Sequence, residues 1–275
     1  MDERTPSRTA LSVAALRAAH QLFDAEPKVL DDPVAARLLD PRWAASLRTD
    51  SERWRTPERT RLRTHVVVRS RFAEDRLAAA VARGVRQAVI LGAGYDTFAF
   101  RQPAWAQALH IVEIDQPATQ ADKRARLSRA GIAIPPNVTF HAVDFERTPL
   151  AAALPAAIDV TRPAFFSWLG VIPYLGTSAI EAVFRAVAAL PRESEIAFSF
   201  AGPRTGEDAI ETAAEAVGEP WRTRLAPEEL DTMLRALGYR EVRFLSPADV
   251  ADRYLSGRGD DLQPANQTTI GTALV

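Results

Sequence analysis

Short apolar runs rich in valine, isoleucine and phenylalanine recur along the chain after its first third. The runs are continuous rather than alternating, which is typical of strands that are buried on both faces of a sheet. The pattern predicts such strands at residues 88–91, 109–114, 138–143, 164–169 and 195–200.

The segments between these runs carry helical signals. In residues 116–131, Pro117 suits the first turn of a helix and Gly131 suits its end. The chain closes with a predicted helix and two strands expected at one edge of the sheet, at 227–238, 239–245 and 268–275. This alternation predicts an α/β fold, a doubly wound, mostly parallel, seven-stranded sheet.

The first 85 residues contain no convincing strand pattern. Helical patterns at 9–22 and 58–83 predict a helical extension or cap over residues 1–85, followed by a core over residues 86–275. In the second helix one apolar stripe also contains Arg69; its other members are Leu62, Val66, Ala73, Leu77 and Ala80. A charge that faces a core needs a partner there, so Arg69 is a candidate functional residue.

Composition and charge narrow the classes of function. The 275 residues are 47% hydrophobic, and their 34 basic and 35 acidic side chains create no overall field that favours nucleic acid or membrane partners. The absence of cysteine removes disulfides and thiolate ligands, and the four histidines lack metal-binding spacing. No signal peptide or membrane span is recognisable, so we expect a cytoplasmic protein without a metal. Seven arginines in the stretch 53–71 are interpreted as a solvated helix face, the alternative being a surface that attracts an acidic acceptor.

A glycine turn follows the first predicted strand, in the stretch "RQAVILGAGYDTFAFR" (86–101). In parallel sheets the loop after the first strand approaches the ligand closely, so Gly92, Ala93 and Gly94 are candidate binding residues. A dinucleotide fingerprint would need a third glycine where Thr97 stands, and Tyr95 would crowd a pyrophosphate, which weakens a nicotinamide interpretation. A tight turn without any ligand remains the alternative.

Two acidic residues end the next two strands. Asp115, followed by Gln116, is placed to accept hydrogen bonds from the hydroxyls of a ribose. Asp144 is placed to accept from an adenine amine, and Phe145 offers an apolar contact. Each acid alone could be a solvated loop residue, but together with the glycine turn they predict a pocket for an adenosine that lacks a pyrophosphate.

S-adenosylmethionine fits such a pocket, because its methionine end carries a free carboxylate. A bidentate contact between arginine and carboxylate is strong and geometrically specific, so Arg69 is a candidate for this end of the cofactor. The alternatives are that Arg69 reaches water from the edge of its stripe or pairs with an acid of the protein.

A family resemblance supports this interpretation. The motifs "VILGAGYDTFAFR", "VEIDQP", "VRSRFAEDRL" and "HAVDF" resemble the leucine carboxyl methyltransferase family, particularly its bacterial branch of S-adenosylmethionine-dependent methyltransferases. The resemblance implies a Rossmann-like class I methyltransferase with an N-terminal helical extension. It implies cofactor-binding roles for Arg69, Gly92, Asp115, Asp144 and Phe145.

The chain departs from the family at the end of the fourth strand. Many members have a glutamate before a glycine there, whereas this chain has Leu169 before Gly170. No Ser-His-Asp order and no paired catalytic carboxylates are recognisable, so we assign no catalytic base. We expect an O-methyltransferase that modifies a carboxylate or hydroxyl of a small molecule. Arg17, His20 and Tyr174 are weaker candidates for contact with that acceptor. The alternatives are a non-catalytic protein that binds an adenosine ligand and, less favoured, a nicotinamide-dependent oxidoreductase.

Overall fold

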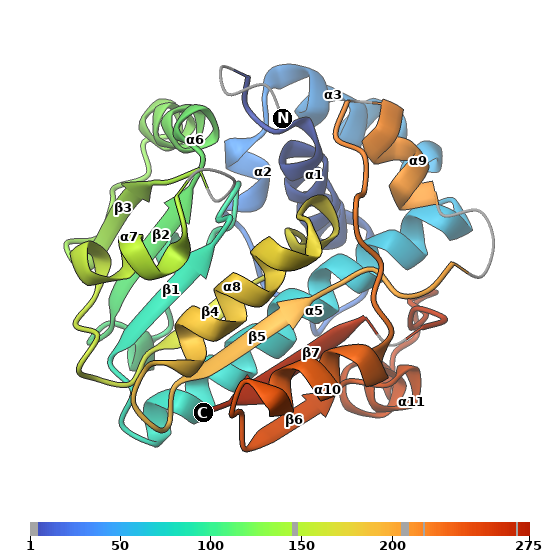
Figure 1. Ribbon diagram of the computed structural model, residues 1–275. Helices are drawn as coiled ribbons and strands as arrows, with labels where there is room; N and C mark the ends of the chain where they lie inside the picture. The colour runs from blue at the N-terminus through green and yellow to red at the C-terminus, as the bar shows by residue number, and fades with distance from the viewer. Residues whose placement is uncertain (1–4, 145–147, 205–208, 217, 268) are drawn as a thin grey trace.

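The computed structural model describes residues 5–144, 148–204, 209–216, 218–267 and 269–275. A seven-stranded sheet with the order β3-β2-β1-β4-β5-β7-β6 forms its centre (Figure 1). The strands are β1 Gln87–Leu91, β2 His110–Asp115, β3 Val138–Ala142, β4 Phe165–Trp168, β5 Glu195–Ser199, β6 Glu241–Phe244 and β7 Ile270–Leu274. Every strand predicted from the apolar runs is confirmed, and the fold is the expected mostly parallel α/β sheet.

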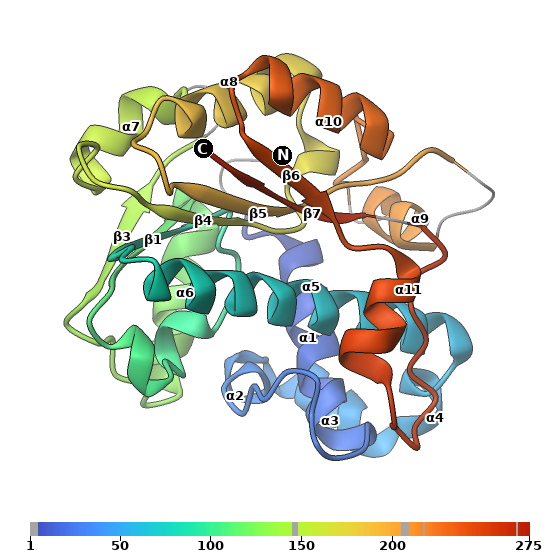
Figure 2. The same ribbon diagram turned by 90° about the horizontal axis from the view of Figure 1, so that it is seen from below.

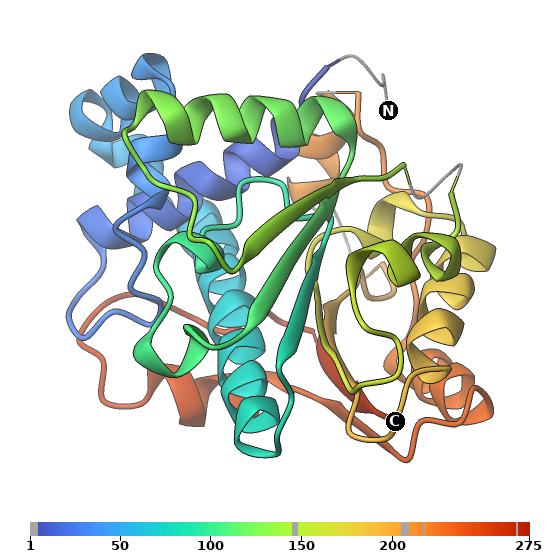
Figure 3. The same cartoon turned by 90° about the vertical axis from the view of Figure 1, so that its left-hand side faces the viewer.

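Strands β1 to β5 run parallel, and β7 pairs antiparallel with both β5 and β6. Val89 of β1 lies in register with Val112 of β2 and Phe166 of β4. Figure 3 shows β1, β2 and β3 pointing toward the end of the molecule where the N-terminus lies. The carboxyl ends of the parallel strands therefore meet at one edge, where their loops can form a common site.

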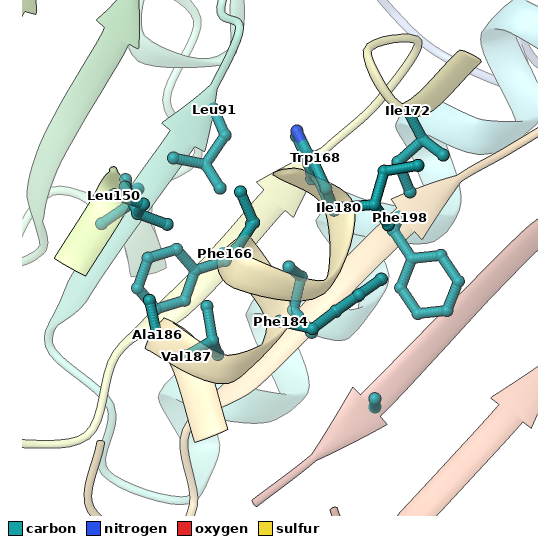
Figure 4. Close-up of a cluster of buried hydrophobic side chains, with 14 of the residues drawn as sticks. Leu91, Leu150, Phe166, Trp168, Ile172, Ile180, Phe184, Ala186, Val187 and Phe198 are labelled. Atoms are coloured by element: carbon teal, nitrogen blue, oxygen red, sulfur yellow. The ribbon is translucent and has the colours of Figure 1, made fainter. Parts of the chain in front are cut away.

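One face of the sheet is covered by α7 (Leu150–Ala157), α8 (Thr177–Ala188) and α10 (Pro227–Ala236), as Figure 2 shows. Their apolar side chains pack with the sheet into one buried cluster. Figure 4 shows Phe184 of α8 among Phe166, Trp168 and Phe198 of the strands. Aromatic rings at this interface meet edge to face, with the centroids of Phe184 and Phe198 5.2 Å apart.

The other face is covered by α5 (Pro57–Ala82), α6 (Pro117–Arg129) and the N-terminal helices. The predicted helices at 9–22 and 58–83 are confirmed as α1 (Arg8–Phe23) and α5, and the helix at 116–131 as α6. Thr56 begins α5 as its N-cap, because its side chain accepts a hydrogen bond from the Arg59 N–H. Residue 85 remains our proposed boundary between the helical extension and the core.

The interpretation of the stretch 53–71 as a solvated helix face holds for Arg53, Arg55, Arg61 and Arg71, which are exposed, but not for the whole stretch. Val67, Val68 and Phe72 lie on other sides of the helix and are buried too. Arg63, counted within the solvated arginine-rich stretch, is only 2% exposed and pairs with Asp24. The helix is buried on several sides because α1 packs on Val66, while the loop after α1 and the C-terminal part of the chain pack on Val67, Val68 and Phe72.

The remaining elements are short or lie in the C-terminal part. Pro41 at the first position of α3 and the Asp40 side chain, which accepts from the Trp43 N–H, fix the start of that helix. No described helix is both long and apolar enough to cross a membrane. The short helices are α2 Ala35–Leu38, α3 Pro41–Thr49, α4 Ser51–Trp54, α9 Ala209–Ala216, α11 Pro247–Val250, η1 Phe98–Phe100, η2 Ala104–Ala106, η3 Ile172–Tyr174 and the π-helix η4 Ala251–Leu255.

Candidate functional site

A pocket lies at the carboxyl ends of the parallel strands, between the strand loops, the start of α1 and the middle of α5. It encloses about 1140 Å³, counting the space that is open to solvent. Most of the residues predicted from the sequence line it: Arg17, Arg69, Gly92, Ala93, Gly94, Asp115, Gln116, Asp144 and Tyr174. The topology thus brings together residues from six separate segments.

Two predicted residues are not part of this described lining. Phe145 lies outside the residues that the structure describes. The structure corrects the assignment of His20 to the acceptor site, because this residue is fully buried away from the pocket. Its Nδ1 lies 2.7 Å from Asp24 Oδ2, and its Nε2 accepts a hydrogen bond from the Leu30 N–H. His20 therefore ties α1 to the loop that follows it.

The glycine turn is held against β2 by its backbone. The N–H groups of Gly92 and Ala93 both donate to the Ile114 carbonyl, at 2.8 and 3.2 Å. Gly92 has a φ of 62°, and a Cβ atom there would lie 2.3 Å from Cγ2 of Val171. Only glycine fits this position, so the backbone of the turn faces the pocket without a side chain.

Replacing Gly92 by alanine should destabilise the protein more than an equal change at Gly131. Both residues have left-handed backbones, with φ values of 62° and 61°, and a side chain in that region costs about 1–2 kcal/mol. At Gly131 an added Cβ would meet nothing within 4 Å. We expect Gly131→Ala to show the backbone effect alone and Gly92→Ala to lose at least twice as much in urea unfolding. Equal losses would contradict the steric argument.

Asp115 supports the turn directly. Its Oδ2 accepts a hydrogen bond from the Gly94 N–H, and its Oδ1 accepts from the Gln116 N–H at 2.6 Å. Burial raises the pKa of this carboxyl, and the two backbone donors oppose that rise. Each carboxylate oxygen can accept a further hydrogen bond. The group can therefore hold the turn and still accept from a ligand hydroxyl.

Arg69 projects from the middle of α5 into the pocket, beside the loop after β4. A Cβ atom on Gly170 would lie 2.9 Å from Nη2 of Arg69, so glycine at that position leaves room for the guanidinium. Burial lowers the pKa of Arg69 to about 10, and Tyr174 and Asp96 act in the opposite direction. Within the described part of the chain the guanidinium makes no hydrogen bond or ion pair, so its donors are available to a ligand.

Arg17 also lines the pocket, but its donors are used by the protein. Its Nε donates to Asp32 Oδ2 at 2.9 Å, and its Nη2 donates to the Tyr95 carbonyl. Asp32 also accepts from the Thr97 hydroxyl at 2.7 Å. Although burial raises the pKa of Asp32, the neighbouring guanidinium groups of Arg17 and Arg101 outweigh it and lower that pKa. Through these contacts Asp32, Arg17 and Thr97 hold the glycine turn in place. The sequence analysis did not identify Asp32, which lies at the centre of the cluster.

Tyr95 also belongs to the pocket lining. Its ring packs with Ala14, Val34 and Leu127, and its hydroxyl lies 2.5 Å from Asp122 of α6. Tyr95 therefore anchors the turn to α6. The crowding of a pyrophosphate by this ring stays a prediction.

The far side of the pocket contains residues that the sequence analysis did not identify. Ser7 and Thr9 come from the start of α1, and Glu219 comes from a loop more than 200 residues later. Tyr174 lies beside Thr9, and burial raises the pKa of its hydroxyl although hydrogen bonds with Trp221 and Thr9 act in the opposite direction. No local pattern marks Glu219, because its partners are distant in sequence.

Leu169 lines the pocket and packs against the apolar cluster formed by α5, β1 and β4. The position therefore offers the pocket an apolar wall instead of a carboxylate. Within the described ranges, no three histidine or acidic side chains are grouped so that they could hold a metal ion.

Comparisons with known proteins agree with this geometry. A model of the leucine carboxyl methyltransferase family matches residues 10–188. YktD of Bacillus subtilis (strain 168), provisionally named an S-adenosyl-L-methionine-dependent methyltransferase, is 30% identical over 294 residues, which cover 95% of each chain. A protein of Mycobacterium avium (strain 104) with the same provisional name is 36% identical over 193 residues, 66% of this chain and 60% of that one.

Solved structures share the fold at low identity. A duf574 family protein from Streptomyces avermitilis has a TM-score of 0.57 at 17% identity, covering 99% of this chain and 98% of its own. A provisionally named methyltransferase from Thermobifida fusca YX also has a TM-score of 0.57, at 19% identity, covering 99% and 96%. At these identities the likeness shows the fold alone.

Proposed function

Since the chain belongs to the leucine carboxyl methyltransferase family and is an S-adenosylmethionine-dependent methyltransferase, we propose that it methylates an oxygen atom of a small-molecule acceptor. The acceptor group is a carboxylate or a hydroxyl. The observation that carries the site assignment is the half-buried guanidinium of Arg69, which has no hydrogen-bond or ion-pair partner in the described chain and faces a pocket that also contains Asp115.

The residues present fit the two ends of the cofactor. Arg69 would hold the methionine carboxylate, because its planar donors match a carboxylate in a bidentate way. Gly92 would allow close approach of the backbone, since any side chain there meets Val171. Asp115, with Gln116 beside it, would accept from the ribose hydroxyls, and Asp144 lies in the lining on the side assigned to adenine.

The chemistry demands little of the protein beyond positioning. Bound S-adenosylmethionine supplies a methyl group that is already activated by the positive charge of its sulfonium. The pocket aligns the acceptor oxygen with the methyl group. Leu169 and Val171, which are apolar parts of the lining, exclude water from it. A carboxylate acceptor needs no base, whereas a hydroxyl benefits from one.

Isothermal calorimetry with S-adenosylmethionine and with NAD tests the cofactor assignment. We expect binding of S-adenosylmethionine and none of NAD, because Thr97 fills the position of the third fingerprint glycine and is buried against Asp32. Binding of NAD alone would refute the proposal. Release of S-adenosylhomocysteine across a panel of carboxylates and phenols separates an enzyme from a binding protein, since tight binding without turnover favours the latter.

Substituting Asp115 by asparagine should weaken S-adenosylmethionine binding by about 1–3 kcal/mol, because hydrogen bonds to a charged acceptor are lost. Asparagine keeps one oxygen for the Gly94 N–H, so the turn should remain folded. Asp159→Asn is a matched control, because Asp159 is exposed and accepts from Thr161 outside the pocket. Calorimetry on both variants gives the comparison, and equal affinities would remove Asp115 from the ribose site.

A further inference from the structure

Glu219 is a buried acid that none of the cofactor roles uses. It lines the pocket and is 7% exposed. The other acids of the described lining have other roles. Asp115 and Asp144 are assigned to the nucleoside of the cofactor. Asp96 accepts a hydrogen bond from the Phe98 N–H at 2.8 Å. Glu219 lies instead with Tyr174, Thr9 and Ser7, and we assign this group of side chains to the acceptor.

The carboxylate of Glu219 is held in place by the start of α1. Its Oε1 accepts from the Arg8 N–H at 2.9 Å, and its Oε2 accepts from the Ser7 hydroxyl at 3.1 Å. A carboxylate has lone pairs for about four hydrogen bonds, so both oxygens keep capacity for a ligand. The group is fixed in position and still able to accept a proton.

Thr9 and Tyr174 lie with Glu219 in the pocket lining. The Thr9 side chain is buried beside the Tyr174 hydroxyl, on which Glu219 also acts electrostatically. A hydroxyl both donates and accepts, so Thr9 and Tyr174 can donate to the oxygen of a group that enters this part of the pocket.

This arrangement distinguishes the two acceptor classes. A hydroxyl can donate its hydrogen to Glu219 while its oxygen accepts from Thr9 or Tyr174. A carboxylate would bring a second negative charge against a buried one, which is unfavourable at low dielectric. The site therefore suits a neutral group that has both a donor and an acceptor.

We propose that the methyl acceptor is a hydroxyl group, phenolic or alcoholic, and that Glu219 is the general base that takes its proton. This inference rests on the proposed methyltransferase function. In the step, the acceptor O–H bond breaks and its proton passes to a Glu219 oxygen. The acceptor oxygen forms the new bond to the methyl carbon, and the electrons of the carbon–sulfur bond remain on sulfur, which leaves as a neutral thioether. General base catalysis of this kind contributes about 10²–10⁴-fold to rate.

The first test measures binding and uses phenols matched by benzoates of the same ring skeleton. Each pair is titrated by ligand-observed NMR against the protein saturated with S-adenosylhomocysteine. We expect the parent to bind the phenols at least ten times more tightly than the benzoates. In Glu219→Gln the carboxylate charge is absent, so the preference should fall below threefold, mainly because the benzoates gain affinity.

Glu229→Gln is the matched control. Glu229 also accepts a backbone N–H at the start of a helix, that of Ala226 at 2.7 Å, but it lies outside the pocket. This variant should keep the parental preference. Turnover gives a second readout, because Glu219→Gln should lose about 10²-fold or more on a phenol but much less on a nitrophenol that is already ionised.

The outcomes separate the inference from the proposed function. A parent that binds benzoates as well as phenols, or that binds neither series, overturns the hydroxyl assignment whether or not the variants fold. A Glu219→Gln protein that is folded and keeps the parental preference overturns the role of Glu219. Failure of the parent to bind S-adenosylhomocysteine would instead refute the proposed function itself.

Discussion

Replacing Arg69 by methionine should weaken S-adenosylmethionine binding by about 100-fold or more without destabilising the protein. Loss of hydrogen bonds between charged groups is worth about 1.5–3 kcal/mol each, and a bidentate contact has two. Methionine has a similar length and leaves no acid unpaired, because Arg69 has no ion-pair partner in the described chain. Calorimetry gives the affinity and thermal melting gives the stability of the cofactor-free protein.

The choice of ligand sharpens this test. Adenosine lacks the methionine carboxylate, so its affinity should change little in Arg69→Met. Arg69→Lys should have an intermediate effect, since an ammonium keeps the charge but cannot reproduce the planar fork. Arg71→Met, two residues along α5 at a position that is 47% exposed, is the matched control. Equal losses for adenosine and S-adenosylmethionine, with a large drop in melting temperature, would assign Arg69 a structural role.

Replacing Arg63 by methionine should destabilise the protein by about 3–5 kcal/mol, because it leaves the buried carboxylate of Asp24 without its main partner. Two nitrogens of Arg63 each lie 2.7 Å from an Asp24 oxygen, and a third donates to the Trp54 carbonyl. We expect a fall in melting temperature on the order of 10 °C. Arg71→Met should shift it by less than about 1 kcal/mol, because the Arg71–Asp75 pair is exposed.

The pH dependence gives a second readout of the Arg63 cluster. Burial alone would raise the pKa of Asp24, but hydrogen bonds from His20 and Arg63 outweigh it, so the pKa lies below its usual value. A carboxyl with a lowered pKa stabilises the fold above its unfolded pKa and loses that contribution as the pH falls through the folded pKa. Arg63→Met should therefore lose less stability than the parent between pH 5 and about pH 3. An unchanged acid profile would contradict this account of Asp24.

The sheet could be predicted from the sequence because its signals are local. Each strand is a continuous apolar run. The run at 88–91 begins one residue later than β1, and the run at 109–114 begins and ends one residue earlier than β2. Helices α2 and α4 were not predicted, since four residues are too few for a 3.6-residue period to show. The environment of α5 was mistaken for another reason. Periodicity reports one apolar stripe, not the distant loop and C-terminal residues that pack on Val67, Val68 and Phe72.

The cofactor side of the pocket was predictable because parallel topology places all strand ends together. Gly92 and Asp115 follow strands that were themselves recognisable. The acceptor side was not, because its contacts join distant segments: Glu219 reaches Arg8 across 211 positions of sequence. Asp32 was missed likewise, since Thr97 is 65 positions away. Their roles as binding and supporting residues stay predictions until the variants are measured.

The position of β7 between β5 and β6 has a consequence for how the chain is made. β5 ends at Ser199 and β6 at Phe244, yet both pair with a strand that begins only at Ile270. During synthesis, the open edge of β5 therefore stays unpaired while some 70 further residues are made, which takes about 4–14 seconds at ordinary translation rates of about 5–20 residues per second. An unpaired strand edge is a template for wrong partners. The half of the sheet that contains the cofactor loops can form on the ribosome first, whereas the other half is exposed to misfolding until β7 emerges.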